Sequence, residues 1–352
     1  MRNETRTLFN QFATQVAKLN GVPDATQKFA VEPTIQQRLE KRIQESSDFL
    51  SRINMIGVDD LKGEKLALGV SGPIASRTNV ANQDRQTRDL STLDAQGYEC
   101  RMTEFDTHIG YAKLDAWAKF PNFQGMIRDA IVRQQALDRM MIGFNGTSAA
   151  AQTDPVANPM LQDVNIGWLQ HYRTQAPARV LKDGKTAGKI LIDPTKTKDA
   201  NGNITGIVGD YATLDALVYD VVNSLIEVWY RKAPGLVVIV GRNLMADKYF
   251  PLLNQTLPSE QMAADLVISQ KRIGGLQGMD VPYFPDNGLM VTTLDNLSIY
   301  WQNGARRRHV AENPKRNRIE NFESSNDAYV VEDFGAGCLV ENIEMSEAAL
   351  NG

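Results

Sequence analysis

The sequence has few cysteines and no long apolar run. Its two cysteines, Cys100 and Cys338, are too few for a disulfide framework, so we expect a reducing compartment. No stretch approaches the ~18 apolar residues of a membrane-spanning helix. The first residues, MRNETRTLFNQF, lack the apolar segment of a secretory signal. These features exclude fibrous, secreted and membrane-embedded proteins.

A strong charge of one sign is also missing. The chain of 352 residues has 38 Lys and Arg against 42 Asp and Glu, for a formal net charge of −4. Such a chain has no overall basic field that would attract nucleic acid or anionic lipid. Apolar residues make up 42% and charged residues 23%, as in ordinary folded proteins. The length is sufficient for one large domain or two.

Residues 5–19 have the apolar spacing of an amphipathic helix. Its apolar side chains recur at intervals of three or four, at Leu8, Phe9, Phe12, Val16 and Leu19. The Asn20-Gly21 pair ends the helix, and the polar linker PDATQKFAVEP follows, with one apolar island at Phe29-Ala30-Val31. The residues leave two interpretations open. The helix is either an ordinary first helix of the domain or a detachable segment that binds a partner along its apolar face.

The next segment predicts a long two-stranded ribbon. Residues 65–70 alternate like a half-buried strand, and a strand pattern returns at Tyr98, with a change of phase by Phe105 that suggests a bulge. Large apolar side chains between them are sparse: Ile74, Val80, Leu90 and Leu93. Arms of about 15 residues would reach roughly 50 Å, whereas a chain of this length has a radius of gyration of about 20 Å. The ribbon is therefore either disordered or laid across a neighbouring subunit.

The rest of the chain mixes helices and strands without a regular βαβ order, which predicts an α+β fold. The longest expected helix covers 122–142, with an apolar stripe that includes Met126 and Met140. The other expected elements are a helix with Trp168, Leu169 and Tyr172 on its packed side, a helix over 214–226, a strand at 236–240, a helix at 259–271, two strands joined by a turn at Asp295-Asn296, and two short strands around Gly335-Ala336-Gly337.

No catalytic, cofactor or metal site emerges from residue types and spacing. The histidines, His108, His171 and His309, lie far apart and have no second ligand type at metal spacing. Both cysteines lie in strand contexts without a CxxC partner and are expected as small buried apolar residues. We therefore expect no catalytic residue, no cofactor and no metal.

Glycine and arginine clusters add no site. The glycines at 143–148 and 274–278 lack the P-loop and dinucleotide fingerprints and indicate loops or caps. The run Arg306-Arg307-Arg308 could contact a phosphate, but a solvated turn or a salt bridge between subunits is favoured.

Extended strings in the chain resemble one family. The order of features resembles the major capsid proteins of tailed bacteriophages with the HK97-type fold, and more closely those of the peduovirus group of contractile-tailed phages. The matching strings include FAVEPTIQQRLEKRIQESSDFLSRIN (29–54), GEKLALGVSGPIASRT (63–78), FNGTSAAAQTDPVANPMLQDVNIGWLQHYR (144–173), LVVIVGRNLMADKYFP (236–251) and YVVEDFGAGCLVENI (329–343).

The resemblance implies a division of the chain into six parts. These are a removable N-terminal segment (1–29), an N-terminal arm (30–57), an extended loop (58–108), a peripheral domain with a spine helix at 122–142 (109–209), an axial domain (210–305) and a return to the peripheral domain (306–352). The predicted ribbon corresponds to the extended loop, which in this family lies over an adjacent subunit. Its few apolar side chains would be buried there. Lys62 and Lys65 lie at the base of this loop, so the covalent cross-link that some members form through a loop lysine is not expected.

The resemblance also implies proteolytic maturation. In this family a maturation protease removes an N-terminal segment during assembly, and we place the cut at Phe29-Ala30. These residues would be the substrate of that protease and not catalytic groups. Before the cut, the segment would face the capsid interior and engage the internal scaffold.

The implied function is structural. Identical subunits would form the pentamers and hexamers of an icosahedral head that carries a portal at one vertex and encloses double-stranded DNA without sequence-specific binding. The protein would assemble in the host cytoplasm, become part of the virion and have no membrane partner. Two alternatives stay open: an encapsulin-like nanocompartment shell, and a soluble α+β enzyme with an unrecognised site.

Overall fold

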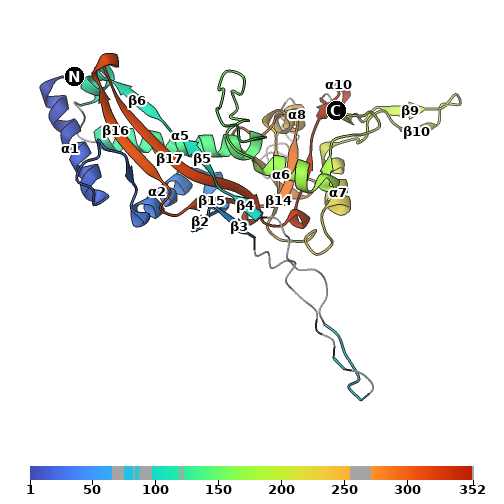
Figure 1. Cartoon of the computed structure of the whole chain (residues 1–352). Helices are drawn as coiled ribbons and strands as arrows, with labels where there is room; N and C mark the ends of the chain where they lie inside the picture. The colour runs from blue at the N-terminus through green and yellow to red at the C-terminus, as the bar shows by residue number, and fades with distance from the viewer. Residues whose placement is uncertain are drawn as a thin grey trace. The chain divides into compact units, whose positions relative to one another are not determined.

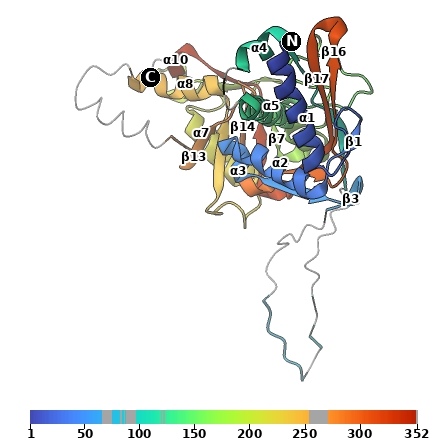
Figure 2. The same cartoon turned by 90° about the vertical axis from the view of Figure 1, so that its left-hand side faces the viewer.

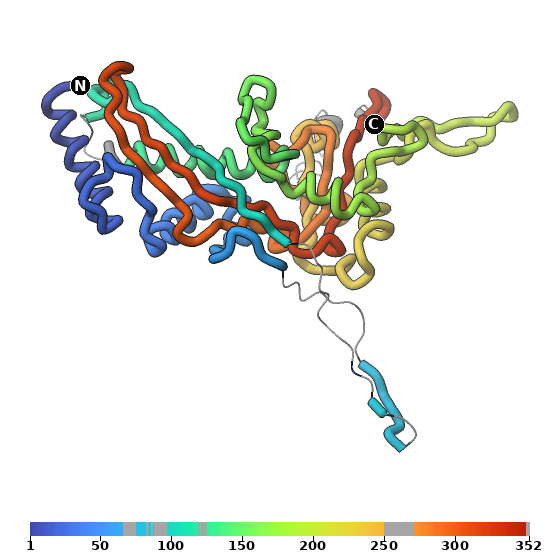
Figure 3. The backbone as a smooth tube through the Cα atoms, viewed as in Figure 1, coloured from blue at the N-terminus to red at the C-terminus, as the bar shows by residue number. Residues whose placement is uncertain are grey.

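The structure is a computed structural model that describes residues 1–65, 75–81, 84–85, 87, 97–118, 120, 123–253 and 271–350. The chain forms two compact units, each built from segments that are separated in sequence (Figures 1 and 3). Unit 1 comprises Met1–Gly63, Tyr98–Trp168 and Ser298–Val330, and unit 2 comprises Glu64–Gly97, Leu169–Leu297 and Val331–Gly352. Helices and strands alternate irregularly, which confirms the predicted α+β class.

Unit 1 is built on a seven-stranded sheet whose longest strand is β17 (Arg318–Val331). Along the path β1-β16-β17-β15-β2, β16 is antiparallel to β17 and β2 is parallel to β15, while β5 and β6 also pair with β17. The other strands are β1 (Phe29–Ala30), β2 (Asn54–Val58), β5 (Arg101–Glu104), β6 (Thr107–Gly110), β15 (Leu297–Gln302) and β16 (Arg307–Asn313).

The predicted change of strand phase is confirmed, but it lies earlier than expected. Cys100 is buried whereas Met102 is 64% exposed, so the alternation breaks between them. There the chain leaves the small sheet of β3 (Lys62–Glu64) and β4 (Gly97–Glu99) and begins to pair with β17. From that point β5 and β6 keep one register against β17, so the predicted bulge near Phe105 is wrong.

The helices of unit 1 include α1 (Asn3–Leu19), α2 (Pro33–Glu45), α3 (Asp48–Arg52), α4 (Tyr111–Trp117) and α5 (Phe123–Asn145). The long helix α5 confirms the prediction at 122–142. Its predicted apolar stripe is partly wrong, because Met126 is 51% exposed while Gln135 and Arg139 are buried. A prediction from the spacing of apolar residues misses buried polar side chains such as these, whose hydrogen-bond partners are buried with them.

Gly143 of α5 makes room for an aromatic cluster in unit 1. A Cβ atom at this position would lie 2.2 Å from Cζ3 of Trp168, which is fully buried. The Trp168 indole N–H donates a hydrogen bond to the Ser298 carbonyl at 3.0 Å. Phe144 and Tyr329 contact the same ring edge-on, at centroid distances of 5.2 Å and 5.4 Å. Gly143 therefore lies inside a helix and not in the predicted loop or cap.

Unit 2 contains a six-stranded sheet in the order β12-β13-β11-β14-β18-β7. β11 runs parallel to β13 and antiparallel to β14. The strands are β7 (Val180–Leu181), β11 (Leu236–Val240), β12 (Arg272–Ile273), β13 (Leu276–Asp280), β14 (Leu289–Thr293) and β18 (Cys338–Val340).

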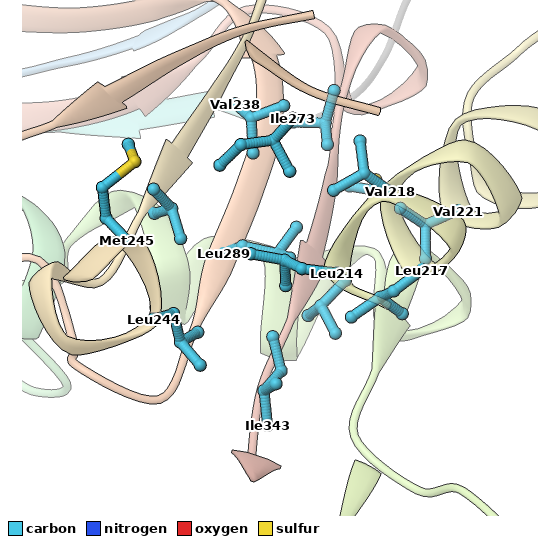
Figure 4. Close-up of a cluster of buried hydrophobic side chains, with 14 of the residues drawn as sticks. Leu214, Leu217, Val218, Val221, Val238, Leu244, Met245, Ile273, Leu289 and Ile343 are labelled. Carbon is cyan, nitrogen blue, oxygen red and sulfur yellow. The ribbon is translucent and has the colours of Figure 1, made fainter. Parts of the chain in front are cut away.

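The core of unit 2 is apolar. Leu217, Val218 and Val221 of α7 (Leu214–Leu225) pack with Val238 of β11 and Leu289 of β14 (Figure 4). The helix predicted at 214–226 and the strand predicted at 236–240 are both confirmed. α6 (Trp168–Gln175) confirms the helix expected around Trp168, and its predicted packed residues are buried.

The two strands predicted on either side of Asp295-Asn296 exist, but they do not form a hairpin. β14 pairs with β11 and β18 in unit 2, whereas β15 belongs to the sheet of unit 1. A short 3-10 turn, Leu294–Asn296, carries the chain from one sheet to the other. The strands around Gly335-Ala336-Gly337 are likewise β17 and β18, in different sheets. Residues 306–352 are therefore divided between the units at Val331.

The remaining elements of unit 2 lie outside its main sheet. β8 and β19 form a parallel pair, and β9 and β10 form a hairpin that projects from the rest of the unit (Figure 1). Their bounds, with those of α8 and α10, are β8 (Ile190–Ile192), β9 (Lys196–Lys198), β10 (Ile204–Ile207), β19 (Ile343–Met345), α8 (Arg242–Leu253) and α10 (Glu347–Leu350). The helix predicted at 259–271 falls almost entirely outside the described residues.

Candidate functional site: the buried ion cluster and the N-terminal segment

Five charged side chains meet in the interior of unit 1. Glu40 comes from α2, Arg139 from α5, Arg306 from the residue before β16, and Glu323 and Asp327 from β17. Side-chain exposure is at most 4% for each of them. We call these five residues the ion cluster. It connects segments that lie far apart in the sequence.

The two arginines each bridge acidic groups on different elements. Arg306 contacts Glu40 and Glu323, each with an N–O distance of 2.7 Å. Arg139 contacts Asp327 at 3.0 Å and forms two hydrogen bonds to Glu40, one of which measures 3.2 Å. Glu40 thus accepts from both guanidinium groups, which ties α2 to α5 and to the start of β16. Such charge-assisted bonds are directional, so they specify how these elements are aligned.

Neutral side chains complete the cluster. The Gln135 side-chain oxygen accepts from Arg306 at 2.7 Å, and its amide group donates to Glu323 at 3.3 Å. The Ser325 hydroxyl donates to Asp327 at 3.0 Å. Buried charges are stable only when their hydrogen-bonding capacity is met in this way.

Burial and charge pairing act in opposite directions on the carboxylates. Burial alone would raise the pKa of Glu40, but Arg139 and Arg306 outweigh it and lower that pKa below its ordinary value. Glu323 behaves in the same way, with Arg306 and Arg308 as the main causes of its lowered pKa. For Asp327 burial prevails and raises the pKa. The two glutamates are therefore held as carboxylates at neutral pH.

The arginine run is not the solvated turn that we expected, because Arg307 and Arg308 lie in β16 and Arg306 is buried, while a salt bridge from Arg307 to another subunit stays a prediction. Arg306 is completely buried in the ion cluster, and Arg308 donates to Asn321 at 2.8 Å, while Arg307 is exposed. The three neighbours differ because side chains alternate between the two faces of an extended chain. Neither Arg306 nor Glu40 carries a local sequence signal for burial, since Arg306 opens a run of three arginines and Glu40 is followed by Lys41 and Arg42. Only the pairing of distant segments brings them together.

The predicted processing residues lie at the edge of the unit 1 sheet. Phe29 pairs with Arg308 and Ala30 with Arg307, so Phe29–Ala30 forms β1. Phe29 is buried and Ala30 is exposed, as are Thr26, Gln27 and Lys28 before them. The two residues are therefore in an extended conformation next to an exposed linker.

The helix predicted at 5–19 is confirmed as α1, and its apolar face packs on unit 1. Phe9 contacts a cluster formed with Leu114 of α4, Val310 of β16 and Ile319 of β17. Val16 packs in a second cluster with Ala17, Ala25, Phe29 and Val31. In Figure 2, α1 lies beside α4 and the β16–β17 strands.

Four apolar side chains of the predicted extended loop are expected to be buried on an adjacent subunit, and the structure describes one of them. Val80 is 70% exposed in the single chain. Ile74, Leu90 and Leu93 lie outside the described residues. The base of the predicted loop is the β3–β4 pair, so the start and end of the predicted ribbon lie together.

Lys65, beside that base, is buried in unit 2. Its ammonium group donates to the Val331 carbonyl at 2.6 Å and lies 5.2 Å from the Phe334 ring centre. A lysine held in this way is a structural anchor and is poorly placed to react with another subunit.

Both cysteines and His309 are held in structural settings. Both cysteines are buried, and burial is the main cause that raises the pKa of Cys100 and of Cys338 to about 12, which disfavours the reactive thiolate. The imidazole of His309 stacks on Phe322, and its Nε2 hydrogen-bonds the Thr26 carbonyl at 2.9 Å.

Two further absences hold for the described part of the chain. No group of three or more His, Cys, Asp or Glu residues there could hold a metal ion. Within the same residues, no helix combines the length and the apolar character that crossing a lipid bilayer requires.

Comparisons with known proteins agree over the whole chain. The model of a family described as phage major capsid protein, P2 family, matches residues 8–343. The chain is 50% identical to a capsid protein of Escherichia phage P2, over 99% of this chain and 96% of the relative. It is 42% identical to the major capsid protein of Serratia phage KSP20, over 100% of both chains.

A solved structure gives the same result. A chain of the satellite phage P4 procapsid, determined with its size determination protein, is 47% identical and superposes with a TM-score of 0.78, over 99% of this chain and 100% of that one. A capsid chain of an empty GTA particle, at 13% identity and a TM-score of 0.50 over 85% of this chain and 90% of its own, shares the fold alone. The fold is thus the HK97-type capsid fold, and the chain belongs to the P2 family of phage major capsid proteins.

Proposed function

We propose that this major capsid protein assembles with copies of itself into the pentamers and hexamers of an icosahedral phage head that encloses double-stranded DNA. The observation that carries the proposal is the similarity to a procapsid subunit over 99% of the chain, with a TM-score of 0.78. Rings of identical subunits use heterologous contacts that close on themselves. Many weak contacts of this kind act together through multivalency.

The parts of the chain suggest how one subunit would contact its neighbours. We assign residues 30–57 to an N-terminal arm and 58–108 to an extended loop that crosses an adjacent subunit. Val80 supports the loop assignment, because it is 70% exposed in the single chain and contact with a neighbouring subunit would bury it. We assign 109–209 and 306–352 to a peripheral domain with its spine near 122–142, and 210–305 to an axial domain.

We also propose that the N-terminal segment, residues 1–29, is removed during maturation. The support is the position of Phe29 and Ala30 in a two-residue edge strand directly after three exposed residues. Proteases bind their substrates in extended form, and an edge strand needs the smallest rearrangement to be taken up. The further partners in this proposal are an internal scaffold, a maturation protease and a portal, with assembly in the host cytoplasm.

The test is co-expression of the chain with its scaffold and protease, followed by electron microscopy and intact-mass measurement of the particles. We expect closed shells whose subunits begin at Ala30. A discrete monomer or dimer under these conditions would overturn the shell. Closed shells whose subunits all retain residues 1–29 would overturn the cut and leave the shell intact.

A further inference from the structure

The apolar face of α1 is seated in a groove of unit 1. A pocket at this place is lined by Phe9 and Phe12 from α1 and, on the opposite side, by Leu114 of α4, Ile127 of α5 and Val310 of β16. Phe9 and Val16 are buried, although both belong to a segment that joins the rest of the chain only through a linker. The groove therefore holds α1 by side-chain packing, independently of the peptide bonds that follow it.

Polar contacts fix the first turns of the same helix. The guanidinium of Arg6 donates two hydrogen bonds to Glu312 of β16, at 2.9 Å and 2.8 Å, in the bidentate geometry that arginine favours. The Tyr111 hydroxyl donates to the same carboxylate at 2.7 Å. The backbone N–H of Arg2 donates to Asp115 of α4 at 2.9 Å.

The linker is also attached to unit 1 before it reaches β1. The Ala25 carbonyl accepts from the Val310 backbone N–H at 3.1 Å, and the Thr26 carbonyl lies 2.9 Å from Nε2 of His309. Phe29 packs back on Val16, Ala17 and Ala25, so the end of the segment is folded against its own helix. Contacts therefore extend from Arg2 to Phe29.

From these contacts we infer that residues 1–29 remain bound to the subunit after the bond between Phe29 and Ala30 is cut. The groove is then a binding site for an amphipathic helical peptide that the chain itself supplies. The inference rests on the proposed function for its biological setting. Hydrolysis adds one water molecule and leaves a carboxylate on Phe29 and an ammonium group on Ala30, and it removes none of the contacts described above.

Cutting and release are consequently two separate events. The cut frees the arm that begins at Ala30 from its covalent tether to α1. The apolar groove stays covered until another event, such as rearrangement of the subunit or competition by another chain, displaces the peptide. The new carboxylate on Phe29 forms opposite Arg308 in the β1–β16 pair, which does not repel it.

The test uses the full chain with the recognition sequence of a site-specific protease inserted between Gln27 and Lys28, both of which are exposed. After complete cutting, the protein is passed through a size-exclusion column under native conditions, and each fraction is analysed by mass spectrometry. We expect the N-terminal peptide to elute with the rest of the chain. Elution of the peptide by itself at micromolar concentration would overturn the inference.

Substitutions in a synthetic peptide test the groove while the residues that line it on unit 1 stay unchanged. A labelled peptide of residues 1–27, the part that the engineered cut separates, is exchanged onto the cut protein in competition with unlabelled variants. Phe9→Ala is expected to weaken competition by at least about 100-fold, because it removes a buried aromatic side chain. Gln11→Ala, at an exposed position of the same helix, is the matched control and is expected to change affinity by less than about twofold.

Equal competition by the two variants would overturn the groove as the binding site. The engineered cut does not depend on the natural protease, so this test and the test of processing can fail independently. If the subunits of natural shells keep residues 1–29 covalently attached but the engineered cut leaves the peptide bound, processing is wrong and the groove is supported. If the peptide is lost in both settings, the groove is wrong.

Discussion

Unit 2 and unit 1 differ in what fills their interiors. In unit 2, Leu217, Val238 and Leu289 belong to a continuous apolar core. In unit 1, the ion cluster joins α2, α5, β16 and β17 through buried guanidinium and carboxylate groups. Apolar packing tolerates exchange of side chains of similar volume, whereas a buried ion pair fails when one partner is lost. The fold of unit 2 thus depends mainly on apolar packing, whereas unit 1 depends in addition on directional contacts between buried charged groups.

The largest effect is expected from Arg139→Leu in unit 1. The substitution leaves Glu40 and Asp327 buried without one of their cations, so the free energy of unfolding should fall by about 3–5 kcal/mol. Chemical denaturation of the unassembled chain measures it. Arg133→Leu, at an exposed position of the same helix, is the control and should change that energy by less than about 0.5 kcal/mol. Equal losses in the two variants would show that Arg139 is not part of a sensitive cluster.

The corresponding change in unit 2 is Leu217→Ala. Loss of this fully buried side chain should cost about 2–5 kcal/mol, depending on how far the core collapses into the cavity. Tyr219→Ala, two residues along α7 and 69% exposed, is the matched control, expected within about 0.5 kcal/mol of the unchanged chain. A Leu217→Met variant should lose less than about 1.5 kcal/mol. If Leu217→Met lost as much stability as Leu217→Ala, the core would not tolerate an apolar side chain of similar volume, and the prediction would be wrong.

A change of pH separates the two interiors. The pKa of Glu323 is lower in the folded chain than its ordinary value of 4.5, so its stabilising effect is present above about pH 4.5 and is lost as the pH falls through the folded value. Glu323→Gln should therefore cost about 1.5–3 kcal/mol at neutral pH. That loss should shrink as the pH falls below about 4.5.

The loss caused by Leu217→Ala should stay constant over the same pH range, because no titrating group is removed. Denaturation curves of the three chains at several pH values measure both differences. A pH-independent loss for Glu323→Gln would show that Glu323 is not held as a carboxylate by Arg306 and Arg308.

Two glycines of α5 should give the smallest and most opposed effects. Gly143→Ala places a methyl group against the Trp168 ring and should cost about 1–3 kcal/mol. At Gly125 the nearest atom to a new Cβ is the tip of Arg128, at 4.0 Å. Gly125→Ala should therefore stabilise the helix by about 0.5–1 kcal/mol. Thermal unfolding of both variants measures these changes in stability. A loss of stability in Gly125→Ala would contradict the prediction.

The apolar parts of this fold were predictable from the sequence. The spacing of Leu214, Leu217, Val218 and Val221 fixes one face of α7, and the run at 236–240 predicts a central strand, because burial leaves a periodic trace in the residue types. The amphipathic pattern of α1 likewise predicted a helix with one packed face. Its groove was not predictable, since Leu114 and Val310 belong to distant segments.

The charged parts could not be predicted. Arg306 and Glu40 have the composition of surface residues, and only the pairing of distant elements buries them. Strand partners were also hidden: the patterns of β14 and β15 are both those of buried strands, and nothing local shows that they join different sheets. The family resemblance supplied the capsid fold, but it did not identify the ion cluster.

The order in which the sheets are completed bears on synthesis of the protein on the ribosome. β14 pairs on one side with β18, and the ion cluster takes two carboxylates from β17, so both units need residues from 323–340. A nascent chain that has reached Thr293 carries β14 with an open edge, a template for wrong strand pairing. Its two units can become complete only when synthesis is nearly finished. A chain that ends before Glu323 therefore lacks both the strand that covers the open edge of β14 and two carboxylates of the ion cluster.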